Sequence, residues 1–281
     1  MPLIKKISEL QNRLSSIRQN GQRIAFVPTM GNLHEGHLDL VRYAKENSDC
    51  SVVSLFVNPL QFGGTGDFAS YPRSLQADCE RLQGLSVDYI FAPKAEEIYP
   101  QDIDTMTKVI VPDWSDVLCG ESRRGHFSGV TTVVTKLFNI VSPHIAVFGE
   151  KDFQQLQIIR KMVLDLNMVV DVIGVATRRE NDGLAMSSRN QYLDEQQRKS
   201  APLIFQVLSN IKREIVAGLS DYEALEKNAT HELKSAGFEP DYVKILDPDN
   251  FLSPCSTSTH LRVFVAAWLG KARLIDNIEI K

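Results

Sequence analysis

The sequence predicts an α/β fold: a doubly wound, Rossmann-like parallel sheet followed by a smaller C-terminal α+β domain. Short apolar runs alternate with longer segments of helical spacing over the first two-thirds of the chain, and this alternation ends near Thr177. Continuous apolar strands separated by helices are typical of a parallel sheet that helices cover on both faces. The length of 281 residues leaves room for a second domain. We therefore expect one domain over residues 1–176 and another over residues 177–281.

The expected elements follow the chain in order. Residues 2–18 carry one apolar stripe and predict a first helix, although their partly basic, amphipathic character also fits a transit peptide. Strands are expected at 24–27, 52–57, 89–92, 145–148 and 169–176. Helices long enough to cross between parallel strands are expected at 38–44, 75–82, 130–141 and 153–166. After a polar junction at 178–190, we expect helices at 194–216 and 222–235 and strands at 242–246, 261–269 and 272–280.

Composition excludes several classes of protein. The formal net charge is −4 and no strongly basic patch is visible, which argues against a dedicated nucleic-acid binder. No window approaches the ~18 consecutive apolar residues that a membrane span needs. The four cysteines form no CxxC pair, and the N-terminus lacks the apolar core of a secretory signal. We therefore expect a cytoplasmic protein, in a reducing compartment, without nucleic-acid or membrane partners.

The segment from Met30 to His37 follows the strand expected at 24–27 and opens the next helix. In a doubly wound sheet, ligands bind beyond the carboxyl ends of strands, and a helix N-terminus offers N–H groups that suit phosphate. His34 and His37 are three residues apart and can share a helix face, from which each imidazole can donate to a phosphate oxygen. Two alternatives are capping or core histidines and a metal site, although no acidic or cysteine cluster lies at a suitable spacing nearby.

A second segment of this kind follows the strand expected at 145–148. Gly149 allows a turn, and Lys151 supplies a compact cation for phosphate. Asp152 can cap the following helix or contact a ribose hydroxyl. The alternative is a plain strand-to-helix turn with a solvated lysine.

A third segment follows the strand expected at 52–57. Asn58 and Gln61 are neutral amides that can hold hydroxyl and carboxylate oxygens, or serve turn chemistry around Pro59. We expect the glycine run at 63–66 to be mobile and residues 120–125 to form a second flexible flap. His126, beside that flap, is expected to be structural.

Residues 34–37, His-Glu-Gly-His, resemble the HIGH signature of the nucleotidylyltransferase and class I aminoacyl-tRNA synthetase superfamily. That superfamily attacks the α-phosphate of ATP and releases pyrophosphate. It carries a second signature, of the KMSKS type, after the nucleotide fold, and here residues 186–189, Met-Ser-Ser-Arg, stand in the polar junction. A basic residue and two hydroxyls on a loop can neutralise departing pyrophosphate and hydrogen-bond to it.

Longer motifs narrow the resemblance to one family. Residues 28–37, 56–62, 125–139, 148–156 and 182–190 resemble, in this order, motifs of the pantoate–β-alanine ligase family. The resemblance covers essentially the whole chain. It implies that ATP and (R)-pantoate give pantoyl adenylate and pyrophosphate, after which β-alanine gives pantothenate, a coenzyme A precursor, and AMP. It also implies Mg²⁺ bound to ATP phosphates and a homodimer, without identifying metal ligands or an interface.

The resemblance also assigns site residues. His37 matches the family's proton donor, and we expect His34, Lys151 and Arg189 to act with it on the phosphates. Gln61 and Gln155 match pantoate-binding residues, Gln61 also serves β-alanine, and we add Asn58 to the pantoate set. The residues expected to hold ATP are Met30, Gly31, Asn32, Leu33, His34, Glu35, Gly36, His37, Gly149, Glu150, Lys151, Asp152, Arg178, Met186, Ser187, Ser188 and Arg189.

The chain departs from the family pattern in three places. Arg178 stands where a small or apolar residue is usual, Arg124 stands where proline is usual, and the loop at 63–66 is rich in glycine. If the contact at 178 is through backbone, ATP binding survives; if the side chain matters, the adenine pocket differs.

Two classes of function compete with this interpretation: another enzyme of the superfamily, and a non-catalytic nucleotide-binding module. Another nucleotidyltransferase of the superfamily would act on a phosphate ester and would need a further cation cluster beyond Lys151 and Arg189. A tRNA synthetase would need an anticodon-binding module or a basic surface. A non-catalytic nucleotide-binding module would not need the full set of histidines, cations and hydroxyls.

Overall fold

A computed structural model of the chain describes residues 1–62, 68, 71–72, 74–255, 258 and 260–280. The glycine run at 63–66, which we expected to be mobile, lies outside the described residues. The chain divides into two compact units. Unit 1 comprises residues 1–116, 123–150 and 154–176, and unit 2 comprises residues 117–122, 151–153 and 177–281.

Unit 1 contains a parallel sheet, as the sequence predicted. Its strand order is β1-β4-β3-β2-β5-β6, and every neighbouring pair in the described chain is parallel. The strands are β1 (Leu3–Ile4), β2 (Ile24–Thr29), β3 (Cys50–Leu55), β4 (Tyr89–Phe91), β5 (Ile145–Gly149) and β6 (Asp171–Val175). The α/β class is confirmed.

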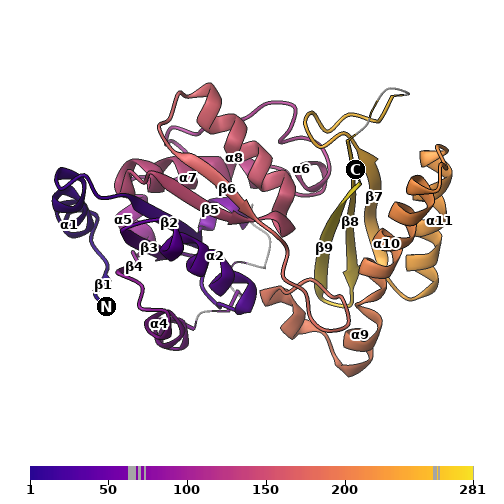
Figure 1. The fold of residues 1–281 in the computed structure, drawn as a ribbon, viewed down its shortest axis with the longest axis horizontal. Coiled ribbons are helices and arrows are strands. Elements are labelled where there is room, and N and C mark those ends of the chain that lie inside the picture. The colour runs from indigo at the N-terminus through magenta and orange to yellow at the C-terminus, as the bar shows by residue number, and fades with distance from the viewer. Residues whose placement is uncertain (63–67, 69–70, 73, 256–257, 259, 281) are drawn as a thin grey trace. The chain divides into compact units, whose positions relative to one another are not determined.

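Helices and short 3₁₀ turns connect these strands (Figure 1). The helices are α1 (Ile7–Gln19), α2 (Glu35–Glu46), α4 (Leu75–Gly84), α5 (Ala95–Ile98), α7 (His126–Val141) and α8 (Phe153–Asp165). The 3₁₀ turns are η1 (Pro59–Phe62) and η2 (Glu150–Asp152).

Alternate residues of the strands pack against different helices, because successive side chains on a strand point to opposite faces. Val27 of β2 belongs to a buried cluster with Leu38 and Val41 of α2. Its neighbour Phe26 packs edge-on against Phe138 of α7, with ring centroids 6.5 Å apart. Both faces of the sheet are therefore covered, which explains why its strands read as continuous apolar runs.

The strand order fixes where unit 1 can bind a ligand. From β2 the chain proceeds to β3 and β4 on one side of β2, and then returns to place β5 and β6 on the other. The order therefore reverses between β2 and β5. In open α/β sheets, ligands bind outside the carboxyl ends of the strands at this switch point.

Unit 2 is built on an antiparallel sheet of order β7-β8-β9. Helices α10 and α11 share one buried cluster with this sheet, which confirms the α+β architecture (Figure 1). The elements of this unit are α6 (Cys119–Ser122), η3 (Ser188–Tyr192), α9 (Glu195–Ser200), α10 (Leu203–Val216), α11 (Tyr222–Ser235), β7 (Glu239–Leu246), β8 (Leu261–Leu269) and β9 (Ala272–Ile280).

Two expected helices are corrected by the structure. Residues 3–4 are not part of the first helix but form β1, because Ala92 N–H donates to the Ile4 carbonyl at 2.8 Å at the sheet edge. The single helix expected at 194–216 is two helices, α9 and α10, with Pro202 between them. Proline lacks an N–H and clashes with the preceding turn, so it favours a helix start over a helix interior. No helix in the described part of the chain is long and apolar enough to cross a membrane.

Candidate functional site

The turn that follows β2 has an unusual backbone. Gly31 has φ +80° and Asn32 has φ +51°, both in the left-handed region. A Cβ on Gly31 would lie 3.0 Å from Oδ2 of Asp78, so the site needs glycine for its conformation and for its close approach to α4.

Asp78 holds this turn through its carboxylate. Its Oδ2 accepts the backbone N–H of Asn32 at 2.9 Å, and its Oδ1 accepts that of Leu33 at 2.8 Å. Ser74 Oγ donates to the same Oδ2 at 3.0 Å. Sequence reasoning missed Asp78. The available signal was its position four residues before Leu82, on the buried face of α4.

His34 and His37 lie together at the N-terminus of α2. His34 is the N-cap residue, and its ring centroid lies 4.0 Å from that of His37. The backbone N–H of His34 donates to Nδ1 of His37 at 3.3 Å. Nδ1 is therefore an acceptor, so a neutral His37 ring carries its proton on Nε2. A hydrogen-bond donor at Nε2 is what a developing phosphate charge requires.

The carboxylate of Glu35 is used within α2. Its Oε2 accepts from Arg42 Nη2 at 3.0 Å, and Arg42 also pairs with Asp39. The hydrogen bond to Glu35 is the largest cause that raises the pKa of the Arg42 guanidinium. Glu35 can therefore contribute its backbone to a ligand at this helix start, while its side chain stabilises the helix.

The amides that follow β3 form a buried network. Asn58 Nδ2 donates to Gln61 Oε1 and to the carbonyl of Gly129, both at 3.1 Å. Tyr99 Oη donates to Asn58 Oδ1 at 2.7 Å, and burial raises the pKa of that phenol. In this structure Asn58 orients Gln61. Gln61 Nε2 in turn lies 3.0 Å from Sδ of Met30, which joins this network to the turn after β2.

His126 supports the same network. Its Nδ1 lies 2.8 Å from the carbonyl oxygen of Gln61, and its Nε2 lies 3.1 Å from Nη1 of Arg123. These contacts agree with the structural role expected for His126. The segment expected as a flap, residues 120–125, contains the end of α6, and Ser122 Oγ lies 3.0 Å from Arg273 Nη2.

The segment after β5 is divided between the units. Gly149 and Glu150 belong to unit 1, whereas Lys151 and Asp152 belong to unit 2. The sequence had placed Lys151 in the first domain and Arg189 in the second, whereas the structure groups both with unit 2. Lys151 Nζ lies 3.8 Å from Asp152 Oδ2, and its side chain is 17 % exposed.

Gln155, a candidate pantoate residue, lies in the first turn of α8 in unit 1 and is half-buried. Its neighbour Gln154 is buried and donates through Nε2 to the carbonyl of Trp114 at 3.0 Å. Of these adjacent glutamines, Gln155 is the more exposed.

The loop at 178–189 forms a short hairpin in unit 2. An antiparallel bridge joins Arg179 to Ala185, and Met186 N–H donates to the carbonyl of Arg178 at 2.9 Å. The Arg178 side chain is exposed. The hairpin therefore uses the backbone at position 178, which any residue supplies.

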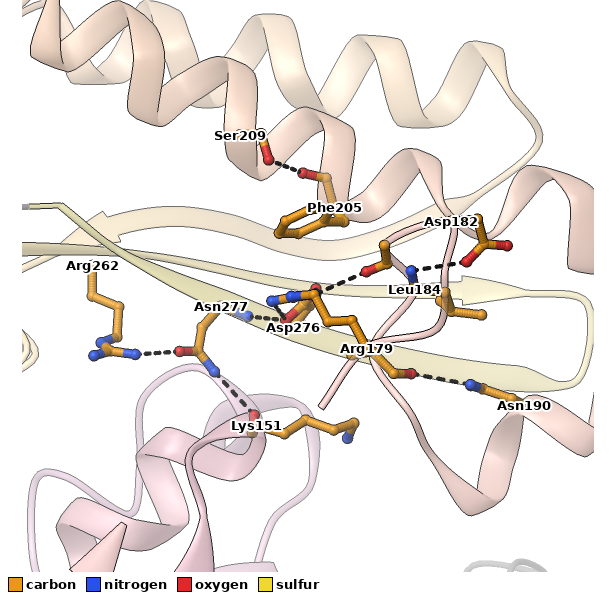
Figure 2. Close-up of polar contacts among 12 residues, drawn as sticks. Lys151, Arg179, Asp182, Leu184, Asn190, Phe205, Ser209, Arg262, Asp276 and Asn277 are labelled. Atoms are coloured by element: carbon orange, nitrogen blue, oxygen red, sulfur yellow. Dashed lines mark hydrogen bonds and ion pairs between the residues drawn. The ribbon is translucent and has the colours of Figure 1, made fainter. Parts of the chain in front are cut away.

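The Ser-Ser-Arg part of the loop opens the η3 turn. Ser187 caps it, since its Oγ accepts the N–H of Arg189 at 3.2 Å. Ser187 and Lys151 line one small pocket together with Asn190 and Asp276. Figure 2 shows Lys151 below the strand that carries Asp276, with Asn190 beside the hairpin. The structure therefore brings the Lys151 motif and the 186–189 motif together within unit 2.

No group of three or more His, Cys, Asp or Glu side chains suited to a metal ion occurs among the described residues. The described residues therefore offer no such cluster as a Mg²⁺ site. Each unit by itself offers hydrogen-bond donors or cations. Unit 1 has N–H groups and His37 at the start of α2, and unit 2 has Lys151 with the 187–189 segment. Such groups bind the phosphates of a nucleotide.

Comparisons with known proteins identify the family. A family model described as pantoate-beta-alanine ligase matches residues 2–279. Two crystal structures of pantothenate synthetase from Thermus thermophilus each match with a TM-score of 0.92, at 41 % and 43 % identity, over 99 % of this chain and 99 % of theirs. The pantoate-beta-alanine ligase of Francisella tularensis, solved with beta-gamma ATP and beta-alanine, matches with a TM-score of 0.84 at 35 % identity, over 99 % of this chain and 97 % of that one.

These matches span both units. The chain therefore belongs to the pantoate–β-alanine ligase family, and it is an enzyme of pantothenate synthesis.

Proposed function

We propose that the enzyme condenses (R)-pantoate with β-alanine at the expense of ATP, through a pantoyl-adenylate intermediate, with AMP and pyrophosphate as the other products. The observation that carries this proposal is the donor geometry of His37. Its Nδ1 accepts the backbone N–H of His34, so a neutral ring carries its proton on Nε2. The ring belongs to the first turn of α2, the helix that follows β2, and the strand order reverses between β2 and β5. The Francisella ligase solved with beta-gamma ATP and beta-alanine supports both molecules as substrates.

In the first step, a carboxylate oxygen of pantoate attacks the α-phosphorus. The new O–P bond forms as the bond from the α-phosphorus to the bridging oxygen breaks, and pyrophosphate leaves. His37 donates to the α-phosphate as negative charge develops on it, with His34 beside it. Lys151 and Arg189 bind the β- and γ-phosphates, and the hydroxyls of the 187–188 pair hydrogen-bond to them. The remaining ATP contacts are those assigned to residues 30–37, 149–152, 178 and 186–189.

In the second step, the β-alanine amine attacks the acyl carbon. The C–N bond forms, the C–O bond to AMP breaks, and the nitrogen loses a proton. Gln61 and Gln155 hold pantoate in this scheme, and Gln61 also serves β-alanine. The hydrogen bond from Asn58 to Gln61 Oε1 turns the Gln61 amide so that its Nε2 faces Met30. Asn58 therefore serves pantoate by orienting Gln61.

We propose that Mg²⁺ binds together with ATP. When bound, the ion would neutralise phosphate charge, and it keeps several water ligands because it dehydrates reluctantly. The described side chains offer no cluster of three acidic, His or Cys ligands for it, so we assign it no protein ligand.

We also propose a cytoplasmic homodimer, since the family that the chain resembles typically forms homodimers and none of the four cysteines is in a disulfide. In this proposal, residues 1–176 bind nucleotide and pantoate, and residues 177–281 carry the KMSKS-like loop. Lys151 acts with the second set, since the structure groups it with unit 2. Light scattering should give a solution mass of twice the chain mass.

Pyrophosphate exchange tests the proposed chemistry. Enzyme, Mg²⁺, ATP, pantoate and labelled pyrophosphate, without β-alanine, should transfer label into ATP, because the first step is reversible and needs no amine. Omitting pantoate should abolish the exchange, since its carboxylate is the nucleophile. Adding β-alanine should then give AMP and pantothenate. Formation of ADP, or exchange that does not depend on pantoate, would overturn the proposal.

A further inference from the structure

We propose that Asp276 and Asn277, adjacent on β9, are a positioning pair that fixes the Lys151 segment and the 178–189 hairpin on opposite sides of one strand. This inference rests on the proposed function, which gives both segments a role in binding phosphate. All residues in this argument belong to unit 2.

Strand β9 has two different faces. Leu274 and Ile280 belong to the buried cluster shared with α10 and α11. Asp276 lies at an even-numbered position like these two, so it shares their face, whereas Asn277 faces the other way. Both side chains are buried, at 4 % and 5 % exposure. A buried carboxylate and a buried amide on one strand need partners, and each finds them in a different motif.

Asp276 holds the hairpin. Its two carboxylate oxygens accept from Nη1 and Nη2 of Arg179 at 2.5 and 2.9 Å. Arg179 Nη1 also donates to the carbonyl of Gly183 at 3.1 Å, and its guanidinium lies 3.9 Å from the centre of the Phe205 ring. Figure 2 shows this arrangement on the side of the strand where α10 packs. The base of the hairpin is therefore tied to β9 by a two-point ion pair.

The hairpin also packs closely at this place. Gly183 has φ +93°, and a Cβ there would lie 2.5 Å from Cδ1 of Phe205. The Arg179 guanidinium covers the same ring. The turn of the hairpin is thus held against α10 while its base is held against β9.

Asn277 holds the Lys151 segment. Its Nδ2 donates to the Lys151 carbonyl at 3.0 Å, and its Oδ1 accepts from Arg262 Nη1 at 2.6 Å. The Arg262 guanidinium lies 3.7 Å from the centre of the Phe153 ring. The amide therefore fixes the backbone from which the Lys151 side chain extends, and Arg262 fixes the next turn of the same segment.

One strand thus anchors two motifs that are far apart in sequence. The Asp276–Arg179 contact joins positions 97 residues apart, and the Asn277–Lys151 contact joins positions 126 residues apart. Neighbouring residues on a strand have a fixed separation, so the pair sets the distance between the Lys151 backbone and the hairpin. Lys151 and Ser187 line the same pocket, so this distance determines how far apart the two phosphate-binding motifs lie there.

The test uses Asn277→Asp in the full-length enzyme. An aspartate still accepts from Arg262 but cannot donate to the Lys151 carbonyl. Hydrogen exchange without substrates should become faster in peptides that cover residues 149–156 and remain unchanged at 178–190. The KM for ATP should rise about three- to tenfold, the range expected for losing one buried hydrogen bond, with the KM for pantoate unchanged. Asn277→Ala, which adds no charge, repeats the measurement if the aspartate variant does not fold.

A second arm of the test uses Asp276→Asn, which should speed exchange at 178–190 and leave 149–156 unchanged. The matched control is Asp241→Asn. Asp241 Oδ2 accepts from Arg273 Nε at 2.7 Å on the same sheet, and both residues of this ion pair lie outside residues 149–156 and 178–190. This control should leave exchange in both segments and the KM for ATP unchanged.

A double-mutant cycle with Lys151→Ala shows whether Asn277 acts through Lys151. If it does, Asn277→Asp should change the KM for ATP less than about twofold in the Lys151→Ala background. Additive effects, or unchanged exchange at 149–156 in Asn277→Asp, would overturn the inference. If Lys151→Ala alone leaves ATP binding intact while exchange at 149–156 still becomes faster in Asn277→Asp, the phosphate role proposed for Lys151 fails and the anchoring by Asn277 stands.

Discussion

The turn after β2 in unit 1 and the hairpin at 178–189 in unit 2 are each held by a buried aspartate. The two aspartates accept hydrogen bonds from different kinds of donor. Asp78 accepts two backbone N–H groups of the turn, at 2.9 and 2.8 Å. Asp276 accepts the side chain of Arg179 instead. The first contact depends on the path of the backbone, and the second depends on one particular cation.

This difference has a consequence for how each region tolerates substitution. Backbone N–H groups are supplied by every residue except proline, so the turn depends on Asp78 and on the left-handed conformations of Gly31 and Asn32. The hairpin depends on Arg179 itself, which also stacks on Phe205. We therefore expect the turn to lose most stability when its acceptor, Asp78, is changed. We expect the hairpin to tolerate substitution at positions that contribute only their backbone groups.

The largest effect is expected for the chemistry of the turn. His37→Ala should lower the rate of pantoate-dependent pyrophosphate exchange by about 10²–10³, the range for losing one donor to a developing negative charge. The melting temperature should change little, because the hydrogen bond that the ring accepts from the His34 N–H is long, at 3.3 Å. Exchange within a few-fold of wild type would show that His37 is not the donor.

A smaller effect is expected for the support of the turn. Asp78→Asn keeps the shape of the side chain but presents an N–H to donors of the turn, so about 2 kcal/mol of unfolding free energy should be lost. Urea denaturation measures this loss, and Ser74→Ala, which removes one of the partners of Asp78, is the milder control. An unchanged unfolding free energy in Asp78→Asn would mean that the turn does not need its buried acceptor.

The smallest effect is expected in the hairpin at position 178. Arg178→Val places an apolar residue at this position, and the backbone contact with Met186 remains. The KM for ATP should change less than about twofold, as for exposed substitutions in general. A larger change, measured in steady-state assays at saturating pantoate, would show that the Arg178 side chain takes part in binding ATP.

Much of the fold could be predicted because its signals are local. The apolar runs predicted β2 to β6, and two strands of unit 2, β8 and β9, agree with their expected bounds. The two-residue strand β1 was missed because its residues continue the apolar stripe of the first helix. The break between α9 and α10 was missed although Pro202 marks it.

The site was predictable only in part, for a physical reason. The motif residues lie in short runs after strands, so their sequence reveals them. The residues that hold those motifs act across long separations: Asp78 on Leu33 over 45 positions, and Asn277 on Lys151 over 126. A local pattern can place Asp78 on the buried face of α4, but it does not show which distant residue the side chain contacts. The grouping of Lys151 with unit 2 was likewise not visible in the sequence.

The proposed attack of the pantoate carboxylate on the α-phosphate of ATP can be followed through the oxygen atom that it transfers. Pantoate labelled with ¹⁸O in both carboxylate oxygens is converted with ATP and β-alanine, and the products are weighed by mass spectrometry. Attack at the α-phosphate should place one ¹⁸O in AMP and leave the other in the amide carbonyl of pantothenate, because the C–O bond to AMP breaks in the second step. Unlabelled AMP, or label in inorganic phosphate, would contradict it.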